Sequence, residues 1–234
     1  MTDRNIESMS DIKKTIATGR DRTNILRKPE QWLIAYLVQR IPLWISSDML
    51  TAIGFFGNIL TFASFVLAAY LHSAYLLLGV VGFGISWFGD SLDGRIAYYR
   101  KKARKWYGYA LDITVDWLGI VLMGLGFMVY VEGKWEIIGF LFVVLYGWEM
   151  ITTTVRYKIS GTYSIDSGLL GPTEVRIILS IIFILEVVVP GSILYVSSFV
   201  TLVLFFKNIT DTKKLLQIGD QYDNAEKEQA KRNN

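Results

Sequence analysis

The chain is a succession of long apolar stretches separated by short polar connections. Six of these stretches come close to the roughly 20 residues that a helix needs to cross a bilayer. The expected spans are Leu50–Leu71, Ser73–Asp93, Leu111–Val131, Trp135–Val155, Thr173–Val189 and Ser192–Phe206. Pro190 and Gly191 leave only a tight turn between the last two spans. The pattern therefore predicts an all-α integral membrane protein with six transmembrane helices.

The residues before the first span follow a different pattern. Between Pro29 and Trp44, apolar residues recur at helical spacing and polar residues fill the rest of each turn. This predicts an N-terminal amphipathic helix over residues 29–46 that lies in the membrane interface, although a helix packed against the membrane domain fits equally well. Residues 1–28 are polar and lack the apolar core of a signal peptide, so we expect a mobile, uncleaved cytoplasmic segment.

Basic residues fall mainly on one side of the expected bundle. The connection after the second span is rich in Lys and Arg, and further basic residues follow the fourth and sixth spans, whereas the opposite connections contain only Lys134. The positive-inside rule then places both termini and the functional site on the cytoplasmic side. The predicted layout is a membrane catalytic domain over residues 47–206 and a charged cytoplasmic tail over 207–234, polar enough from Gly219 onward to be disordered.

Composition narrows the chemistry that the chain can perform. Its 234 residues are 52% hydrophobic, they include no Cys, and His72 is the single His. Disulfides, thiolate metal sites and Cys nucleophiles are therefore excluded, and zinc sites built from His and Ser-His-Asp catalysis have almost nothing to work with. The net charge of +3 is modest, and no nucleic-acid partner is expected. Any catalysis falls to carboxylates.

Four aspartates stand where the second and third spans meet. Asp90 and Asp93 are three residues apart, and Asp112 and Asp116 are four apart, so each pair shares one face of a helix. A single Asp can simply cap a helix, but each one at the centre of a span costs roughly 2.5–3.5 kcal/mol. Because no Lys or Arg alternates with these four, a divalent cation bound by their oxygens is the economical source of opposite charge.

A cation site beside a basic connection suits a substrate that carries phosphate groups. Gly94 directly follows Asp93, and Gly108 precedes the second pair of aspartates. A residue without a side chain allows a ligand to approach the backbone closely, although glycines at these places also serve helix packing or helix ends.

The spacing of these residues resembles a known signature. Asp90-x-x-Asp93-Gly94-x-x-Ala97, followed by Gly108-x-x-x-Asp112-x-x-x-Asp116, is similar to the motif of the CDP-alcohol phosphotransferase family. Ser47-Asp48-Met49-Leu50-Thr51 resembles, imperfectly, the family's Pro-Asn-x-x-Thr segment. Where the family has an Arg after the motif's Ala, this chain has Tyr98, and we expect Arg95 or Arg100 to replace that Arg.

This resemblance implies an enzyme of phospholipid synthesis. It would transfer a phosphatidyl group from CDP-diacylglycerol to the hydroxyl of a small polar alcohol and release CMP. The four aspartates would hold one or two Mg²⁺ or Mn²⁺ ions, and Asp116 would also act as general base. The residues expected to contact the nucleotide or the CDP-lipid are Thr51, Gly94, Arg95, Ala97, Arg100 and Gly108. The resemblance also makes a homodimer plausible.

A second group of polar residues predicts where the acceptor binds. Arg176 lies inside an apolar run, where a cation usually faces a partner or a cavity. If Arg156, Lys158 and Arg176 converge, they form a cationic site for a phosphate on the acceptor, which favours inositol phosphate or glycerol phosphate. The open alternative is that Arg176 forms a structural ion pair with Glu149 or Glu174.

Two other classes of membrane protein also bury carboxylates. An intramembrane aspartyl protease needs a Gly-x-Gly-Asp pattern, and here Trp87 occupies the position of its first Gly. A polytopic cation transporter is the alternative function, although it would place its carboxylates near mid-membrane on broken helices.

Overall fold

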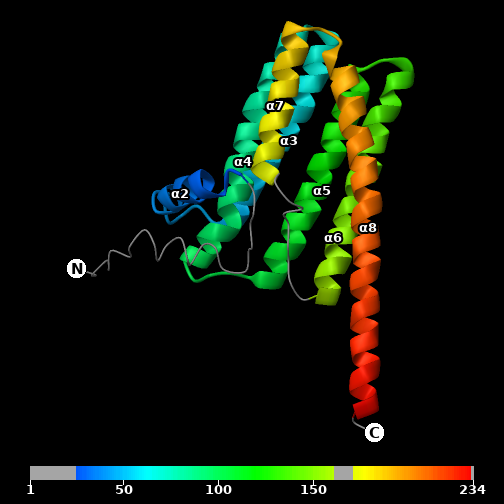
Figure 1. The fold of residues 1–234 in the computed structure, drawn as a ribbon. Helices are drawn as coiled ribbons and strands as arrows, with labels where there is room; N and C mark the ends of the chain where they lie inside the picture. Colours follow the sequence, from blue (N-terminus) through cyan, green and yellow to red (C-terminus); the bar gives the residue numbers. More distant parts are fainter. Residues whose placement is uncertain (1–24, 161–170, 233–234) are drawn as a thin grey trace, which may run out of the picture.

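The computed structural model describes residues 25–160 and 171–232, and within these ranges all regular secondary structure is helical (Figure 1). The helices are α2 (Arg27–Val38), α3 (Ser47–Tyr70), α4 (Leu76–Tyr99), α5 (Lys105–Tyr130), α6 (Glu136–Ser160), α7 (Pro172–Val188) and α8 (Ser192–Arg232). Two 3₁₀ turns, η1 (Ser73–Tyr75) and η2 (Gly133–Trp135), lead into α4 and α6. The predicted all-α fold is confirmed for these residues. The mobile segment expected over residues 1–28 lies almost entirely outside them.

Several of these helices are long and apolar enough to cross a membrane. Within the described residues there are five: α3, α4 with η1, α5, α6 with η2, and α8. Helix α7 has only 17 residues. The chain is thus a multi-pass membrane protein, and five of the six expected spans correspond to helices of sufficient length.

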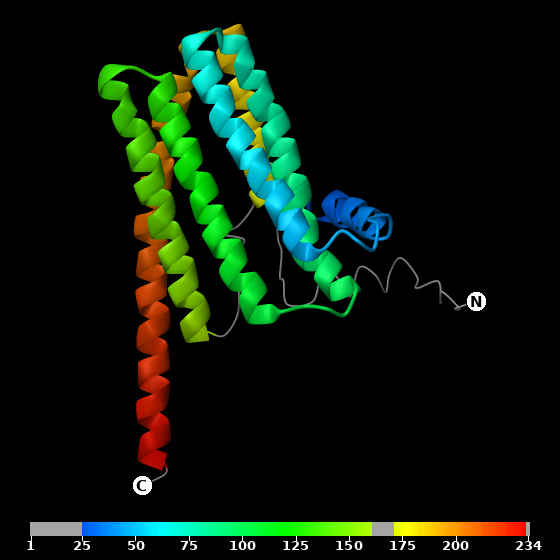
Figure 2. The ribbon, with the colours of Figure 1, turned by 180° about the vertical axis from the view of Figure 1, so that it is seen from behind.

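The six long helices form a ring. They contact one another in the order α3, α4, α7, α8, α6 and α5, and α5 contacts α3 again. Helices α3, α4 and α7 make one side and α5, α6 and α8 the other, as both ribbon views show (Figures 1 and 2). At the α3–α4 crossing the backbones touch, because a Cβ on Gly89 would lie 2.3 Å from the Gly54 nitrogen. This contact fixes the rotation of α4 beside α3.

One end of the ring contains the main apolar core and a buried carboxylate. Phe65 packs edge-on against Phe127 and Phe183. Close by, Glu186 of α7 accepts hydrogen bonds from the Tyr130 hydroxyl and from the backbone nitrogens of Gly191 and Ile193, all within 2.9 Å. Glu186 therefore caps the first turn of α8 and ties α5, α7 and α8 together.

Helix α2 lies beside the opposite end of α4 (Figure 1). Its inner face buries Ile34, Ala35 and Val38, and its outer face exposes Trp32 and Tyr36. The helix ends at Val38, short of the predicted residue 46, since proline at position 42 cannot continue the helical hydrogen bonding. The placement of the outer face in the membrane interface stays a prediction.

The prediction for the C-terminal tail needs a correction. We expected the last span to end at Phe206 and the tail to be disordered from Gly219, but helix α8 continues unbroken to Arg232. No proline interrupts this stretch, and most of its polar residues favour helix. Lys207 also pairs with Asp211 one turn later at 2.8 Å, and Asn208 is fully buried against α6. The rise in polarity marks the end of the apolar run and not the end of the helix.

Candidate active site

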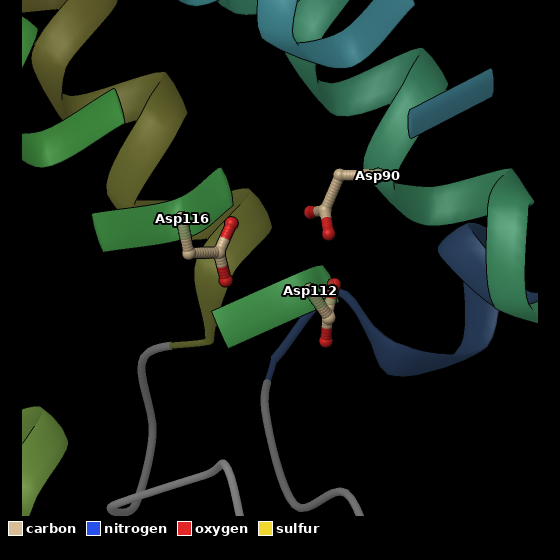
Figure 3. A group of neighbouring side chains, drawn as sticks. All are labelled: Asp90, Asp112 and Asp116. Carbon is tan, nitrogen blue, oxygen red and sulfur yellow. The ribbon is translucent and has the colours of Figure 1, made fainter. Parts of the chain in front are cut away.

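Three of the four aspartates converge between two helices. Asp90 comes from α4, and Asp112 and Asp116 come from α5. One carboxylate oxygen from each lies within 4.8 Å of the others. Figure 3 shows the three carboxylates pointing toward one another. The carboxylates of the two helices thus converge as the sequence predicts, and they form an acidic site inside the ring.

Asp93 lies apart from this group of three. It is buried, and its Oδ2 accepts a hydrogen bond from the Thr51 hydroxyl at 2.6 Å. Its backbone oxygen accepts another from the Ser47 hydroxyl at 2.9 Å. Thr51 thus connects α3 to Asp93, and its expected contact with the CDP-lipid stays a prediction. The role of Asp93 as a metal ligand stays a prediction.

Arg176 belongs to the acidic site. Its Nη2 lies 2.9 Å from Asp90 Oδ2, and its Nη1 is buried with no hydrogen-bond partner among residues 25–160 and 171–232. The Trp87 indole donates to the Thr173 hydroxyl at 3.0 Å, which fixes the first turn of α7 beside α4. The sequence analysis considered Glu149 or Glu174 as the partner of Arg176, but the partner in the structure is Asp90. Glu149 pairs with Lys207 of α8 at 2.7 Å, and Glu174 closes the capping box of α7.

The three carboxylates fit a divalent cation. The ion pair with Arg176 offsets one of their three negative charges, and a doubly charged ion between them suits the other two. Carboxylate oxygens are the ligands that Mg²⁺ and Mn²⁺ prefer. The Asp116 side chain is also exposed to solvent. A ligand can therefore reach it.

Sequence reasoning missed one residue beside this site. The phenol of Tyr146 on α6 lies close enough to Asp116, Asp90 and Arg176 to interact with their charges. A tyrosine within an apolar span looks like an ordinary core aromatic residue. The only signal in the sequence was its position about one helical turn before Glu149.

Arg95 and Arg100, which we expected to bind the nucleotide, both contact other parts of the protein. Their binding to the nucleotide stays a prediction. Arg95 is buried, donates to the Ser91 carbonyl, and lies 3.4 Å from Glu30 of α2. Arg100 donates to the backbone carbonyls of Ile41, Pro42 and Ile45. Both guanidinium groups thus hold α2 and its following loop against α4.

The remaining motif residues are small and at least partly accessible. Gly94 and Ala97 are half-buried on α4, next to the acidic site in sequence. Gly108 is exposed in the first turn of α5, and a Cβ added there would meet no atom within 4 Å. Space for a ligand therefore exists at Gly108.

The predicted acceptor residues do not form one group through any contact that the structure shows. Among the described residues, Arg156 has two buried nitrogens, Nε and Nη2, without hydrogen-bond partners, whereas Lys158 is exposed. Arg176 pairs with Asp90 of the neighbouring helix α4. Their convergence on one acceptor stays a prediction.

The geometry agrees with a comparison with known families. The profile for CDP-alcohol phosphatidyltransferase matches residues 44–206. The chain belongs to this family. The matched region runs from the residues just before α3 into α8 and contains all four aspartates. A search of curated proteins found no match. Membership of this transferase family leaves the transporter alternative without support.

Proposed function

We propose that this family member transfers a phosphatidyl group from CDP-diacylglycerol to the hydroxyl of a small polar alcohol and releases CMP. The observation that carries the proposal is the convergence of Asp90, Asp112 and Asp116 within 4.8 Å inside the ring, in a chain of this family. A transfer between two phosphate esters needs charge neutralisation and a base, and this group of residues offers both.

The reaction exchanges the phosphoanhydride bond of the donor's diphosphate for a phosphate ester bond to the acceptor. The acceptor oxygen forms a bond to the lipid-side phosphorus while the bond from that phosphorus to the oxygen of CMP breaks. Asp116, the accessible member of the three, takes the proton of the acceptor hydroxyl as general base. No covalent intermediate with the enzyme is needed, because the acceptor attacks the donor directly.

Asp90, Asp112 and Asp116 would hold Mg²⁺ or Mn²⁺, and Asp93 joins them in the proposal. When bound, the ion neutralises the diphosphate and makes CMP a better leaving group. Arg176 positions the Asp90 carboxylate through their ion pair. These residues therefore orient the donor before the acceptor attacks.

We propose Arg156, Lys158 and Arg176 as the acceptor-binding residues. Two nitrogens of Arg156 that are buried without a hydrogen-bond partner in the described part of the chain support this role, because such donors are costly unless another group satisfies them. Their positive charge favours inositol phosphate or glycerol phosphate as the acceptor.

The proposed orientation has α7 as the sixth span, with the active site and both termini in the cytoplasm. Its support is the basic segment that leads from α4 into α5, in which Lys102, Arg104 and Lys105 are exposed to solvent. Dimerisation stays a prediction from the family resemblance.

The test is CMP release by the purified protein in detergent. CDP-diacylglycerol is supplied with Mg²⁺ or Mn²⁺, and inositol phosphate, glycerol phosphate, serine and inositol are compared as acceptors, each beside Asp116→Asn. Release that depends on one acceptor and is lost in the variant supports the proposal and names the product. No release from folded protein with any metal or acceptor contradicts it.

A further inference from the structure

We infer that Glu174 of α7 is a positioning residue that makes helix α2 a functional part of the active site. Glu174 is buried, and it lies two residues before Arg176, whose guanidinium pairs with Asp90. Its carboxylate fixes the start of α7 to the residue that precedes α2. The orientation of Arg176 at the acidic site therefore depends on α2, although α2 itself contains none of the predicted site residues.

The Glu174 carboxylate joins two segments that are far apart in the chain. Its Oε1 accepts a hydrogen bond from the backbone nitrogen of Leu26, the residue before α2, at 2.7 Å. Its Oε2 accepts one from the backbone nitrogen of Gly171, the residue before α7, at 3.0 Å. Hydrogen bonds to an ionised carboxylate are stronger than those between neutral groups. The first turn of α7 is thus held at the start of α2.

Helix α2 is firmly anchored, so it can hold α7 in place. Ile34 and Ala35 are fully buried in one apolar cluster with Leu92 of α4. Glu30 of α2 also lies 3.4 Å from Arg95 of α4, and both of these side chains are buried. Helices α2 and α7 both pack on α4, and the bond from Leu26 to Glu174 connects them to each other.

The faces of α7 indicate how this bond acts on the acidic site. Thr173 and Arg176 are three residues apart, so they share the face of α7 that meets α4. Glu174 and Arg176 are two residues apart and point to different sides of the helix. Glu174 therefore acts on Arg176 indirectly, because it fixes the rotation of α7 about its axis.

The rotation of α7 matters because the Arg176 guanidinium must reach one particular carboxylate of the acidic site. Without the bond from Leu26, we expect the first turn of α7 to fray and the ion pair with Asp90 to weaken. Asp90 then loses the group that orients it, and the repulsion among the three carboxylates is no longer offset. This consequence for catalysis rests on the proposed function, whereas the coupling of α2 to α7 does not.

A pair of variants at Leu26 tests the coupling. Leu26→Pro removes the N–H that Glu174 accepts, whereas Leu26→Ala keeps it and is the matched control. Proline suits this position, since Leu26 precedes α2 and its φ of −85° is near the value that proline requires.

The measurement is hydrogen–deuterium exchange of the purified full chain in detergent, read by mass spectrometry. We expect Leu26→Pro to speed exchange several-fold in the first turns of α7 and to leave the end of α7, around Glu186, unchanged. Leu26→Ala should match the unaltered protein. Unchanged exchange at the start of α7 in Leu26→Pro overturns the inference.

Turnover tests the positioning role. In Leu26→Pro, kcat for CMP release per folded molecule should fall several-fold, while KM for CDP-diacylglycerol changes little, because the three carboxylates are still present. A merely structural contact would lower the folded fraction and leave kcat per folded molecule unchanged. That result would overturn the positioning role.

Two variants of Glu174 decide the matter if Leu26→Pro does not fold. Glu174→Gln keeps one acceptor oxygen, so we expect slower exchange at the start of α7 and a higher kcat than in Glu174→Ala. Equal values in the two contradict the inference. If the unaltered protein releases no CMP, the proposed reaction fails, and the exchange data still decide whether α2 holds α7.

Discussion

Glu186 and the group of Asp90, Asp112 and Asp116 are two contrasting sets of carboxylates among the apolar helices of the ring. Glu186, beside the apolar core, receives hydrogen bonds from a phenol, two backbone nitrogens and the Ser192 hydroxyl. Asp90, Asp112 and Asp116 instead lie within 4.8 Å of one another, and Arg176 offsets one of their charges. Both arrangements put carboxylates where hydrophobic side chains dominate.

The difference separates a structural carboxylate from a functional one. Donors from α5, from α8 and from the turn that precedes α8 satisfy Glu186, so its charge needs nothing from outside the protein. Three carboxylates facing each other repel, and their grouping is costly to the fold unless a cation joins them. We therefore assign Glu186, whose charge protein donors satisfy, to the stability of the fold, and the mutually repelling group of Asp90, Asp112 and Asp116 to function.

The largest expected effect is on catalysis. Asp116→Asn removes the general base and one metal ligand, and we expect CMP release to fall by about 10³-fold or more. The reason is that an amide neither accepts the proton nor carries the charge that binds the cation. Asp48→Asn, at an exposed aspartate that pairs with Arg104, is the control and should retain activity. Near-normal release by Asp116→Asn would contradict the assignment of this residue.

The next effect is on stability, at the other carboxylate. Glu186→Ala leaves several buried donors without an acceptor, and we expect a loss of about 3 kcal/mol in the free energy of unfolding. Thermal unfolding in detergent measures it. Glu186→Gln keeps an acceptor oxygen and should lose less, and activity per folded molecule should stay unchanged in both variants. A large loss of activity in well-folded Glu186→Gln would show that this acid is not merely structural.

A divalent cation should stabilise the acidic site and not the Glu186 cap. At a concentration 100 times its Kd, Mg²⁺ or Mn²⁺ should raise the free energy of unfolding by about 2.7 kcal/mol, because it binds only the folded protein. Thermal unfolding with and without chelator measures the shift. Asp112→Asn should reduce the stabilisation, and Glu186→Gln should keep it. An equal shift in all three proteins would place the ion elsewhere.

The smallest expected effect concerns the contact that positions α7 at the acidic site. Trp87→Phe removes the hydrogen bond to Thr173 but keeps an aromatic ring, and we expect a loss of about 1 kcal/mol in stability. Activity should fall only a few-fold, because the ion pair between Arg176 and Asp90 still holds α7. Thr173→Val removes the same bond from the other side and should give the same result. Different results for the two would point to a further role for the indole.

The sequence predicted the acidic site because much of its geometry is local. Spacings of three and four residues put each aspartate pair on one helix face. Although α3 lies between α4 and α5 in the ring order, Asp90, Asp112 and Asp116 still come together inside the ring. The position of Asp93 could not be predicted in this way. It depends on the rotation of α4 about its axis, which is set by the contact of Gly89 with Gly54, far away in the chain.

The contacts of Arg95 and Arg100 with α2 could not be predicted from the motif. Their long side chains reach α2 and its loop. The place where α2 docks is set by the burial of Ile34, Ala35 and Val38. The full length of α8 was missed for another reason. Hydropathy reports where lipid contact ends, while helix propensity and pairs such as Lys207 with Asp211 decide where the helix ends.

The length of α8 has a practical use. Its 41 residues correspond to roughly 60 Å, about twice the thickness of the hydrocarbon layer. Much of the helix must therefore project from the membrane. Both ribbon views show its C-terminal part extending as a straight arm beyond the other helices (Figures 1 and 2). A small helical protein fused in register to this arm would give electron microscopy a rigid marker outside the detergent micelle. Such a marker helps to align images of an enzyme that otherwise lies almost wholly inside the micelle.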